Sequence, residues 1–456
     1  MQRAIRNCFS TLVLKKEGNQ AHELAKYAIS FMEKGNPAPQ VLERSKMFHT
    51  DSVICGLSAL ALKTNAPHVL RNEALENVLG RGTKLEHAKV FGSNEYVPFE
   101  KAICANSAAV REWDSNGTVF GYANDPSRQA GEFGHNDFYP VIIGASHLNQ
   151  NLDGATALKA MVLQDEIRGR LCEVFSLKTY KIDHVVYGAI SSICVYGALA
   201  GASPLVIEHA IGMYVAHYIP WRAIRAGKQL SDSKGASAAI STEAAIMCIK
   251  RAMRGFVGPK DIFSNPESVF RWNEKTNGTS PFDITVSNEG SDFAVMGMHF
   301  KLGLYEHQSA GALEGMQKMI FDSKFTSQYK ITDIENINIV AYEPAFGIIG
   351  DPAKRTPTTR QSADHSMVYI VSTMLRKAFD SKDFNARLTT WTNLDEVWKS
   401  LMLEPKDYGH KALFDTQTRD LMTKCTFTHG GPSYDSKYPE GIPTSISVTL
   451  KDGKKF

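Results

Sequence analysis

The sequence lacks the cysteine spacing of a metal-binding or redox-active protein. Its seven cysteines include no CxxC motif and no pair spaced with histidines. They are Cys8, Cys55, Cys104, Cys172, Cys194, Cys248 and Cys425. Zinc and iron–sulfur ligation therefore have no support in the sequence. Most of these residues lie in apolar runs such as "VICGL" and "SSICVY", which is typical of small buried side chains in a reducing compartment.

Four common motifs are also missing: the GxSxG elbow, the HExxH zinc motif, the P-loop and the dinucleotide-binding glycine fingerprint. The chemistries that depend on them have no support here. Charge is nearly balanced, with 51 basic and 48 acidic residues and a net charge of +3. No basic stripe runs along the chain, so we expect no nucleic-acid partner. A local cluster of cations for a small anionic substrate is compatible with this balance.

A long uncharged run at residues 185–207 is not expected to span a membrane. It is rich in Gly, Ala and Ser rather than Leu and Phe, Pro204 interrupts it, and Asp183 and His184 adjoin it. A helix buried in an all-α core fits this composition better than a membrane span.

The first 19 residues are basic, with Arg3, Arg6, Lys15 and Lys16 and no acidic residue before Glu17. This pattern is typical of an amphipathic mitochondrial presequence, and an ordinary basic N-terminal extension is the alternative. We therefore expect a protein of the mitochondrial matrix.

The 456 residues exceed one typical domain, and the pattern along the chain changes once. Residues 20–275 form a series of predicted helices with small residues on their apolar faces. Residues 276–456 add two alternating stretches, at 334–341 and 444–450, that are typical of strands. We predict a mainly α protein, with a large all-helical domain at 20–275 and a smaller α+β domain at 276–456.

The segment 111–140, "REWDSNGTVFGYANDPSRQAGEFGHNDFYP", concentrates Asp114, Thr118 and His135 among glycines and prolines. Pro126 and the glycines exclude one regular helix. Long ordered loops are often functional, and the aromatic residues here argue against disorder. An aromatic-anchored surface loop is the alternative interpretation.

A second unusual segment, "HYIPWRAIRAGKQLSDSKGASAA" at 217–239, contains Arg222, Arg225 and Lys234. Cations beside apolar helices cost desolvation free energy unless an anion pairs with them. Lys234 is expected to open a helix at 234–254, where the helix dipole disfavours a cation but a carboxylate or phosphate would bind. A solvated basic turn is the alternative.

Two histidines stand at the heads of predicted apolar helices: His184 in "YKIDHVVYG" and His307 in "KLGLYEHQSAGALEGM". A lone histidine at such a position is more often a cap or a hydrogen-bonded core residue than a catalytic group. Neither residue alone indicates a site.

Six blocks taken together resemble the MmgE/PrpD family in their order and spacing. They are "REWDSNGT", "GEFGHND", "KIDHVVYGAI", "SDSKGASAA", "YEHQSAGALEG" and "SADHSMVYIV". The resemblance extends from about residue 20 to the C-terminus. That family contains 2-methylcitrate dehydratases and cis-aconitate decarboxylases, and the segments at 169–188 and 222–237 are most similar to the dehydratase-like branch.

The resemblance implies a set of site residues and a fold. Catalytic positions fall on Asp114, His135, His184, Lys234 and His307, and Thr118 falls on a substrate-binding position, to which the cluster adds Arg222 and Arg225. The implied fold is a large helical domain with a smaller α+β lid and the site between them. No metal and no organic cofactor are implied.

The expected function is a metal-independent carbon–oxygen lyase of the 2-methylcitrate dehydratase type, acting on a small tricarboxylate in propionate metabolism. Decarboxylation of cis-aconitate to itaconate is an alternative that would use the same cations. A non-catalytic structural subunit of a mitochondrial assembly is an alternative of another class.

The C-terminus differs from the family, whose members continue beyond this point to a segment that returns to the helical domain. "TSISVTLKDGKKF" predicts a strand and a turn, and only Lys454, Lys455 and Phe456 follow that turn. An unpaired strand edge invites pairing with another chain. We therefore expect this edge to be covered by a second copy in a homodimer or by a separate polypeptide.

Overall fold

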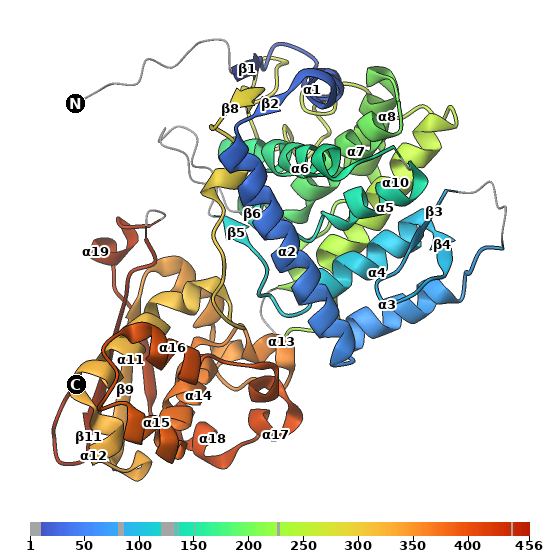
Figure 1. Cartoon of the computed structure of the whole chain (residues 1–456). Helices are drawn as coiled ribbons and strands as arrows, with labels where there is room; N and C mark the ends of the chain where they lie inside the picture. The colour runs from blue at the N-terminus through green and yellow to red at the C-terminus, as the bar shows by residue number, and fades with distance from the viewer. Residues whose placement is uncertain are drawn as a thin grey trace. The chain divides into compact units, whose positions relative to one another are not determined.

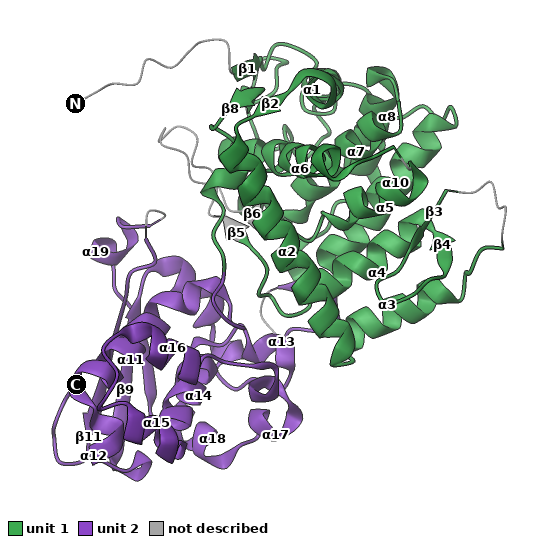
Figure 2. Ribbon diagram, viewed as in Figure 1, with its two compact units in different colours: residues 1–223, 235–300 green, residues 224–234, 301–456 purple. Residues whose placement is uncertain are grey.

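The computed structural model describes residues 11–80, 86–119, 133–134, 136–149, 151–225, 229–438 and 441–456 (Figure 1). The chain forms two compact units (Figure 2). Unit 1 comprises Met1–Ala223 and Gly235–Phe300, and unit 2 comprises Ile224–Lys234 and Lys301–Phe456. The segment 224–234 thus leaves the helical unit in the middle of the chain and belongs to the other one.

Unit 1 is mainly helical. Its helices are α1 (Gln20–Lys34), α2 (Pro39–Ala61), α3 (Asn65–Leu75), α4 (Phe99–Arg111), α5 (Pro140–Leu148), α6 (Gly154–Val174), α7 (Val185–Leu199), α8 (Pro204–His217) and α10 (Ser237–Met253), with the short α9 (Asp232–Gly235) at the junction with unit 2. Figure 1 shows α7 among α6, α8 and α10, and it packs against all three. The core of unit 1 is built around this helix.

Helix α7 is the uncharged run of the sequence, and every residue from Val185 to Gly197 is buried. Gly188 permits its closest contact, since a Cβ atom there would lie 1.9 Å from the Phe138 ring. Burial inside a helical core therefore explains the apolar composition. Among the described residues no single helix is long and apolar enough to cross a membrane, although α2 and α3, bent by 87°, pass that test together by length and composition.

Short strands correct the expectation that the first domain is entirely helical. The pairs are β1 (Thr11–Leu14) with β7 (Ile284–Ser287), β2 (Asn36–Pro37) with β8 (Glu289–Gly290), β3 (His87–Lys89) with β4 (Tyr96–Pro98), and β5 (Thr118–Val119) with β6 (Phe133–Gly134). The β1–β7 pair is antiparallel, and Lys15 forms an ion pair with Asp283 at 2.9 Å. Residues 276–300 therefore belong to unit 1, and the units divide at 300/301 rather than at the expected 275/276.

Unit 2 combines helices with a three-stranded sheet. The helices are α11 (Ala310–Ser323), α12 (Phe325–Gln328), α13 (Arg360–Ala363), α14 (Met367–Asp380), α15 (Lys382–Arg387), α16 (Leu394–Leu401), α17 (His410–Leu413), α18 (Thr416–Thr423) and α19 (Pro432–Asp435). The strands are β9 (Ile334–Ala341), β10 (Cys425–His429) and β11 (Thr444–Leu450) in the order β10-β9-β11. The predicted strand β9 is central, and Ile337 and Ile339 on its buried face have no exposed surface.

The residues after the turn fold back on β11 as a short return segment, with an isolated bridge between Thr449 and Lys455. Phe456 and Val448 exchange backbone hydrogen bonds of 2.9 and 3.2 Å, and Leu450 N–H donates to the Lys454 carbonyl at 2.8 Å. Gly453 has φ +87° in the turn, a conformation that glycine adopts without strain. The Phe456 ring stacks on Phe325 with centroids 4.8 Å apart. The outer edge of β11 at 448–450 is thus covered by its own chain.

Candidate active site

The predicted site residues are divided between the two units. Unit 1 holds Asp114, Thr118, His184 and Arg222, unit 2 holds Arg225, Lys234 and His307, and His135 lies outside the described residues.

Asp114 lies in a buried polar cluster just after α4. Its φ of 51° places it in the left-handed region, where Asp is one of the better-tolerated residues. Arg111, one turn earlier on α4, forms an ion pair with Asp114, and its Nε lies 3.8 Å from Asp137 Oδ2. Burial raises the pKa of Asp137, although the charges of Arg111 and Arg168 act in the opposite direction. The cluster keeps a carboxylate and a guanidinium in contact inside unit 1.

Two asparagines hold this loop in place. Asn116 Nδ2 donates to Asp137 Oδ1 at 3.2 Å, and Gly117 N–H donates to Asn136 Oδ1 at 3.0 Å. Thr118 follows in β5 and is paired in register with Gly134. The described ends of the segment 111–140 are therefore hydrogen-bonded to each other.

His184 and Arg222 are brought together by a short backbone ladder. Asp183 N–H donates to the Pro220 carbonyl at 3.0 Å, and Arg222 N–H donates to the Lys181 carbonyl at 2.7 Å. The imidazole of His184 makes no hydrogen bond to the first turn of α7, whose residues are all described, so it does not cap that helix. Its Nε2 lies 3.9 Å from Asp183 Oδ1. A titratable ring thus adjoins a buried carboxylate and an arginine-bearing segment.

In unit 2, Lys234 does not open the long helix as expected. It lies in α9, and α10 begins separately at Ser237 after the cap residue Ala236. Lys234 is therefore not the first residue of the long helix whose dipole was expected to act on it. Lys234 is only 3% exposed, which excludes the solvated basic turn, whereas Arg225 is half-buried.

The segment that carries Lys234 is fastened to α13. Leu230 N–H donates to Ser362 Oγ at 2.7 Å, and the Leu230 carbonyl accepts from Thr359 Oγ1 at 2.8 Å. Gln361 Nε2 donates to Asp232 Oδ1 at 2.7 Å. Because Asp232 shares α9 with Lys234, these bonds fix the position of the buried lysine relative to α13.

His307 stands beside a buried carboxylate that sequence reasoning missed. Its Nδ1 lies 2.8 Å from Glu306 Oε1, and Glu306 Oε2 accepts from Gln308 N–H at 2.9 Å. Burial raises the pKa of Glu306, but the charge and hydrogen bond of His307, with the charges of His365 and Lys301, outweigh it and lower the pKa to about 2. Glu306 is therefore ionised at neutral pH and holds the imidazole of His307.

Asp364 and His365 form a second pair that was not predicted. His365 Nδ1 donates to Asp364 Oδ1, and Arg360 Nη1 donates to Asp364 Oδ2 at 2.8 Å. The sequence signal is an acidic residue directly before a histidine, but the chain contains five such dipeptides. One of them, Glu208–His209, places its ring against the Gly258 carbonyl, so the dipeptide alone does not identify a site.

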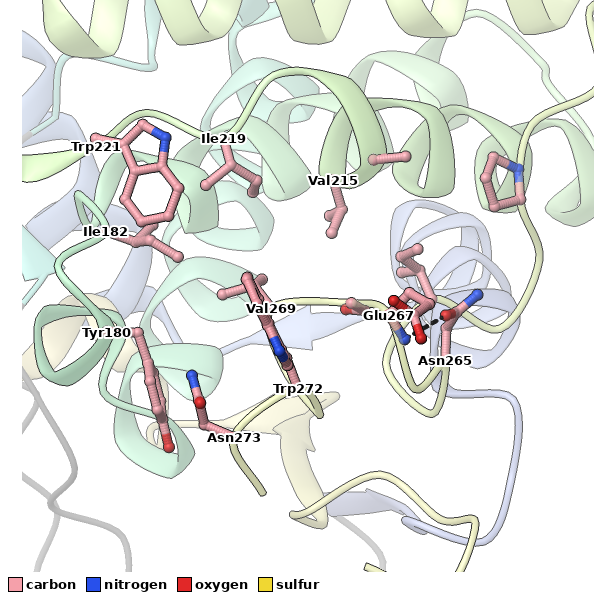
Figure 3. A pocket seen from close by; sticks show the side chains of 14 residues that line it. Tyr180, Ile182, Val215, Ile219, Trp221, Asn265, Glu267, Val269, Trp272 and Asn273 are labelled. Carbon is pink, nitrogen blue, oxygen red and sulfur yellow. Dashed lines mark hydrogen bonds between the residues drawn. The ribbon is translucent and has the colours of Figure 1, made fainter. Parts of the chain in front are cut away.

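A cavity of about 380 Å³ lies in unit 1, beside the ladder that precedes His184 (Figure 3). Ile182, Val215, Ile219, Trp221 and Val269 give it largely apolar walls. Its described lining contains Glu267 and no lysine, arginine or histidine. This cavity suits an apolar group and does not suit a tricarboxylate. Among the described residues, no three His, Cys, Asp or Glu side chains are grouped as metal ligands.

The model of the MmgE/PrpD N-terminal domain matches residues 22–281. The chain belongs to the MmgE/PrpD family. Membership of the MmgE/PrpD family implies a dehydratase-like or related function. The matched region includes the site positions from Asp114 to Lys234, whereas His307 and His365 lie beyond it. A search of curated proteins found no significant match to the chain.

Proposed function

We propose that this MmgE/PrpD protein is a hydro-lyase that dehydrates 2-methylcitrate or a related tricarboxylate. The observation that carries the proposal is the buried Glu306–His307 pair, with Nδ1 of the ring 2.8 Å from an ionised carboxylate. A carboxylate at one ring nitrogen orients the imidazole and stabilises its protonated form. Such a ring is suited to accept a proton from carbon near neutral pH.

The substrate class follows from charge. A tricarboxylate brings three negative charges, and Lys234 is a buried cation in unit 2. Arg222 and Arg225 add guanidinium groups, which bind carboxylates through paired hydrogen bonds. Thr118 is proposed as a further substrate-binding residue. These residues neutralise and orient the anion before any proton moves.

The reaction needs two proton transfers. A base removes the proton from the carbon alpha to a carboxylate, and the electron pair of that C–H bond forms the C=C bond. The carbon–oxygen bond of the neighbouring hydroxyl breaks, and an acid protonates the oxygen, which leaves as water. Positioned groups contribute ~10²–10⁴ in rate at each transfer. His135, His184 and His307 are proposed to serve these transfers, and Asp114 is proposed to orient one of them.

A three-substrate assay tests the function. Purified protein is offered 2-methylcitrate, citrate and cis-aconitate separately, and products are followed by absorbance of the new double bond and by mass spectrometry. An unsaturated tricarboxylate supports the proposal. Itaconate from cis-aconitate would assign the decarboxylase chemistry instead, and no product from any substrate would favour a structural role.

We also propose that the protein acts in the mitochondrial matrix, on the basis of the basic residues at the start of the sequence. Fractionation of cells that express the full chain tests the location. Recovery of the protein outside mitochondria would contradict it.

A further inference from the structure

Two of the acid–histidine pairs in unit 2 are joined by the backbone. Glu306 N–H donates to the Asp364 carbonyl at 2.9 Å, which places the Glu306–His307 and Asp364–His365 pairs next to each other. The charge of His365 acts on Glu306 and contributes to the ionisation of that carboxylate. The second imidazole therefore lies within electrostatic range of the group that holds the first.

The ring of His365, like that of His307, contacts a buried carboxylate. Asp364 is 2% exposed, and its two oxygens are taken by His365 and by Arg360. Because Nδ1 of His365 donates to Asp364, proton exchange with a ligand would pass through Nε2. The side chain of His365 is only 8% exposed, and a buried ion-pair network fixes the orientation of its ring.

The two imidazoles differ in what neutralises their carboxylates. Asp364 receives a direct 2.8 Å hydrogen bond from Arg360, whereas the strongest partner of Glu306 is His307 itself. A carboxylate that is already paired with a guanidinium stabilises a neighbouring imidazolium less. The carboxylate beside His365 is thus shared with a guanidinium, whereas the carboxylate beside His307 receives its strongest interaction from that ring.

Polar atoms near His307 provide a second observation. Gln308 and Ser309 follow it directly and have exposed fractions of 1% and 0%. Within the part of the chain that the structure describes, Gln308 Oε1 and Ser309 Oγ are buried without a hydrogen-bond partner. Buried polar atoms are almost always satisfied in native proteins, so such atoms point to a polar ligand at this position.

We propose that His365, oriented by Asp364, is a further catalytic residue of this protein and donates the proton to the departing hydroxyl, which leaves removal of the proton from carbon to the histidines proposed above. The inference rests on the proposed dehydration. In this step the C–O bond breaks toward oxygen, the Nε2 proton of His365 moves to that oxygen, and water leaves. The proton taken from carbon by the base returns to solvent, and His365 is reprotonated from solvent, so each turnover is balanced.

The alternative is that Asp364–His365 only stabilises the end of α13, and a matched control separates the two. His429 and Asp435 form another His–Asp pair in unit 2, with ring and carboxylate 2.9 Å apart and both partly exposed. The test compares His365→Asn with His429→Asn in the full-length protein. Measured quantities are kcat and KM for the tricarboxylate that the wild type turns over, and the melting temperature.

The proposal expects kcat of His365→Asn to fall at least 100-fold with KM changed less than threefold, and His429→Asn to match the wild type. Asp364→Asn is expected to show a smaller loss in kcat. If kcat of His365→Asn stays within threefold of His429→Asn, His365 is not catalytic. If the wild type turns over no tricarboxylate, the proposed function itself fails, and the inference fails with it.

A measurement on the wild type covers the case in which His365→Asn does not fold. Tricarballylate, a tricarboxylate with no hydroxyl to lose, is titrated into the protein while histidine ring signals are followed by NMR. The ring signal of His365 is expected to shift on binding, and that of His429 is expected to stay in place. An unchanged His365 signal at saturating ligand overturns the proposal.

Discussion

Glu306 N–H donates to the Asp364 carbonyl across 2.9 Å, and this bond joins the segments of unit 2 that carry His307 and His365. Asp364 directly follows α13, the helix to which the Lys234 segment is fastened through Ser362 and Gln361. Hydrogen bonds of this short helix and of the residue after it therefore connect the Lys234 segment with two carboxylate–imidazole pairs. These contacts bring together segments that are distant in sequence.

The first prediction concerns Lys234. Replacing Lys234 with Ala removes the charge-assisted bond proposed between this lysine and the substrate, so KM is expected to rise on the order of ten- to hundredfold, with lower turnover. The melting temperature is expected to change little, because removal of a buried cation also removes its desolvation cost. Steady-state kinetics and thermal melting measure both, with the exposed Lys399→Ala as control. A variant that unfolds readily but keeps full specific activity would make the lysine structural.

The second prediction concerns Asp114. Asp114→Ala breaks a buried ion pair with Arg111 and is expected to lower the free energy of unfolding by about 3 kcal/mol. Asp114→Asn is expected to cost less, because Asn tolerates the left-handed conformation and keeps an acceptor. Lys63 has the same φ of 51° on the surface, so Lys63→Ala controls for the backbone. Urea unfolding measures all three, and a cost of Asp114→Ala no larger than that of Lys63→Ala would contradict the role of the carboxylate.

The third prediction concerns the pH dependence of stability at Glu306. The pKa of about 2 in the folded protein lies below the ordinary 4.5, so the ionised carboxylate stabilises the fold above pH 4.5. This contribution is lost as pH falls from 4.5 to 2, and the shift corresponds to roughly 3 kcal/mol. The stability difference between wild type and Glu306→Gln should therefore be largest near neutral pH and shrink across that window. Urea midpoints at several pH values measure it.

The exposed Glu335→Gln on β9 serves as the control for Glu306. Its stability difference from the wild type is expected to be small at every pH. A Glu306→Gln difference that stays constant from pH 7 to pH 3 would show that the carboxylate is not held in its ionised form by its neighbours.

The fourth prediction concerns the C-terminal hairpin. Phe456→Ala removes the stacking on Phe325 and is expected to lower the free energy of unfolding by about 1–2 kcal/mol. Deletion of residues 454–456 also uncovers the edge of β11 at 448–450 and is expected to promote association. Thermal melting and light scattering measure the two effects, with Lys455→Ala as control. A deletion variant with wild-type melting and scattering would show that this return segment neither stabilises the fold nor prevents association.

The earlier expectation that a second chain covers β11 remains a prediction for the rest of that strand. Light scattering of the wild type tests it, with a homodimer as the expected result. A monomer at all concentrations would contradict the homodimer.

The strand β9 and the buried helix α7 were predicted because each leaves a local pattern in the sequence. The alternation of Ile337 and Ile339 identified β9, and the small-residue composition of 185–200 identified a buried helix, because one face of a strand or all faces of a helix must be apolar to be buried. The boundary between the two units could not be predicted from a local pattern. It depends on the pairing of β7 with β1, and these strands come from opposite ends of unit 1.

The candidate site was predicted only in part, because it too depends on contacts between segments that are distant in sequence. Asp114 and His184 lie in blocks that resemble the family, and the ion pair of Arg111 with Asp114 has helical spacing that could have been noticed. A backbone hydrogen bond from Glu306 N–H to the Asp364 carbonyl places Asp364 and His365 beside the other pair. No local sequence pattern shows which acid–histidine dipeptides lie next to each other in the fold. The break between α9, which ends at Gly235, and α10, which begins at Ser237, was missed. Apart from Gly235, the residues of this run favour one continuous helix.

The most direct test of the proposed dehydration is an NMR analysis of the products that the wild type forms from 2-methylcitrate. The expected product is an unsaturated tricarboxylate that has lost one water and no carbon dioxide, and its formation is expected to be strongly reduced in the Lys234→Ala variant. Unchanged 2-methylcitrate and citrate after prolonged incubation with folded protein would show that the chain is not this hydro-lyase.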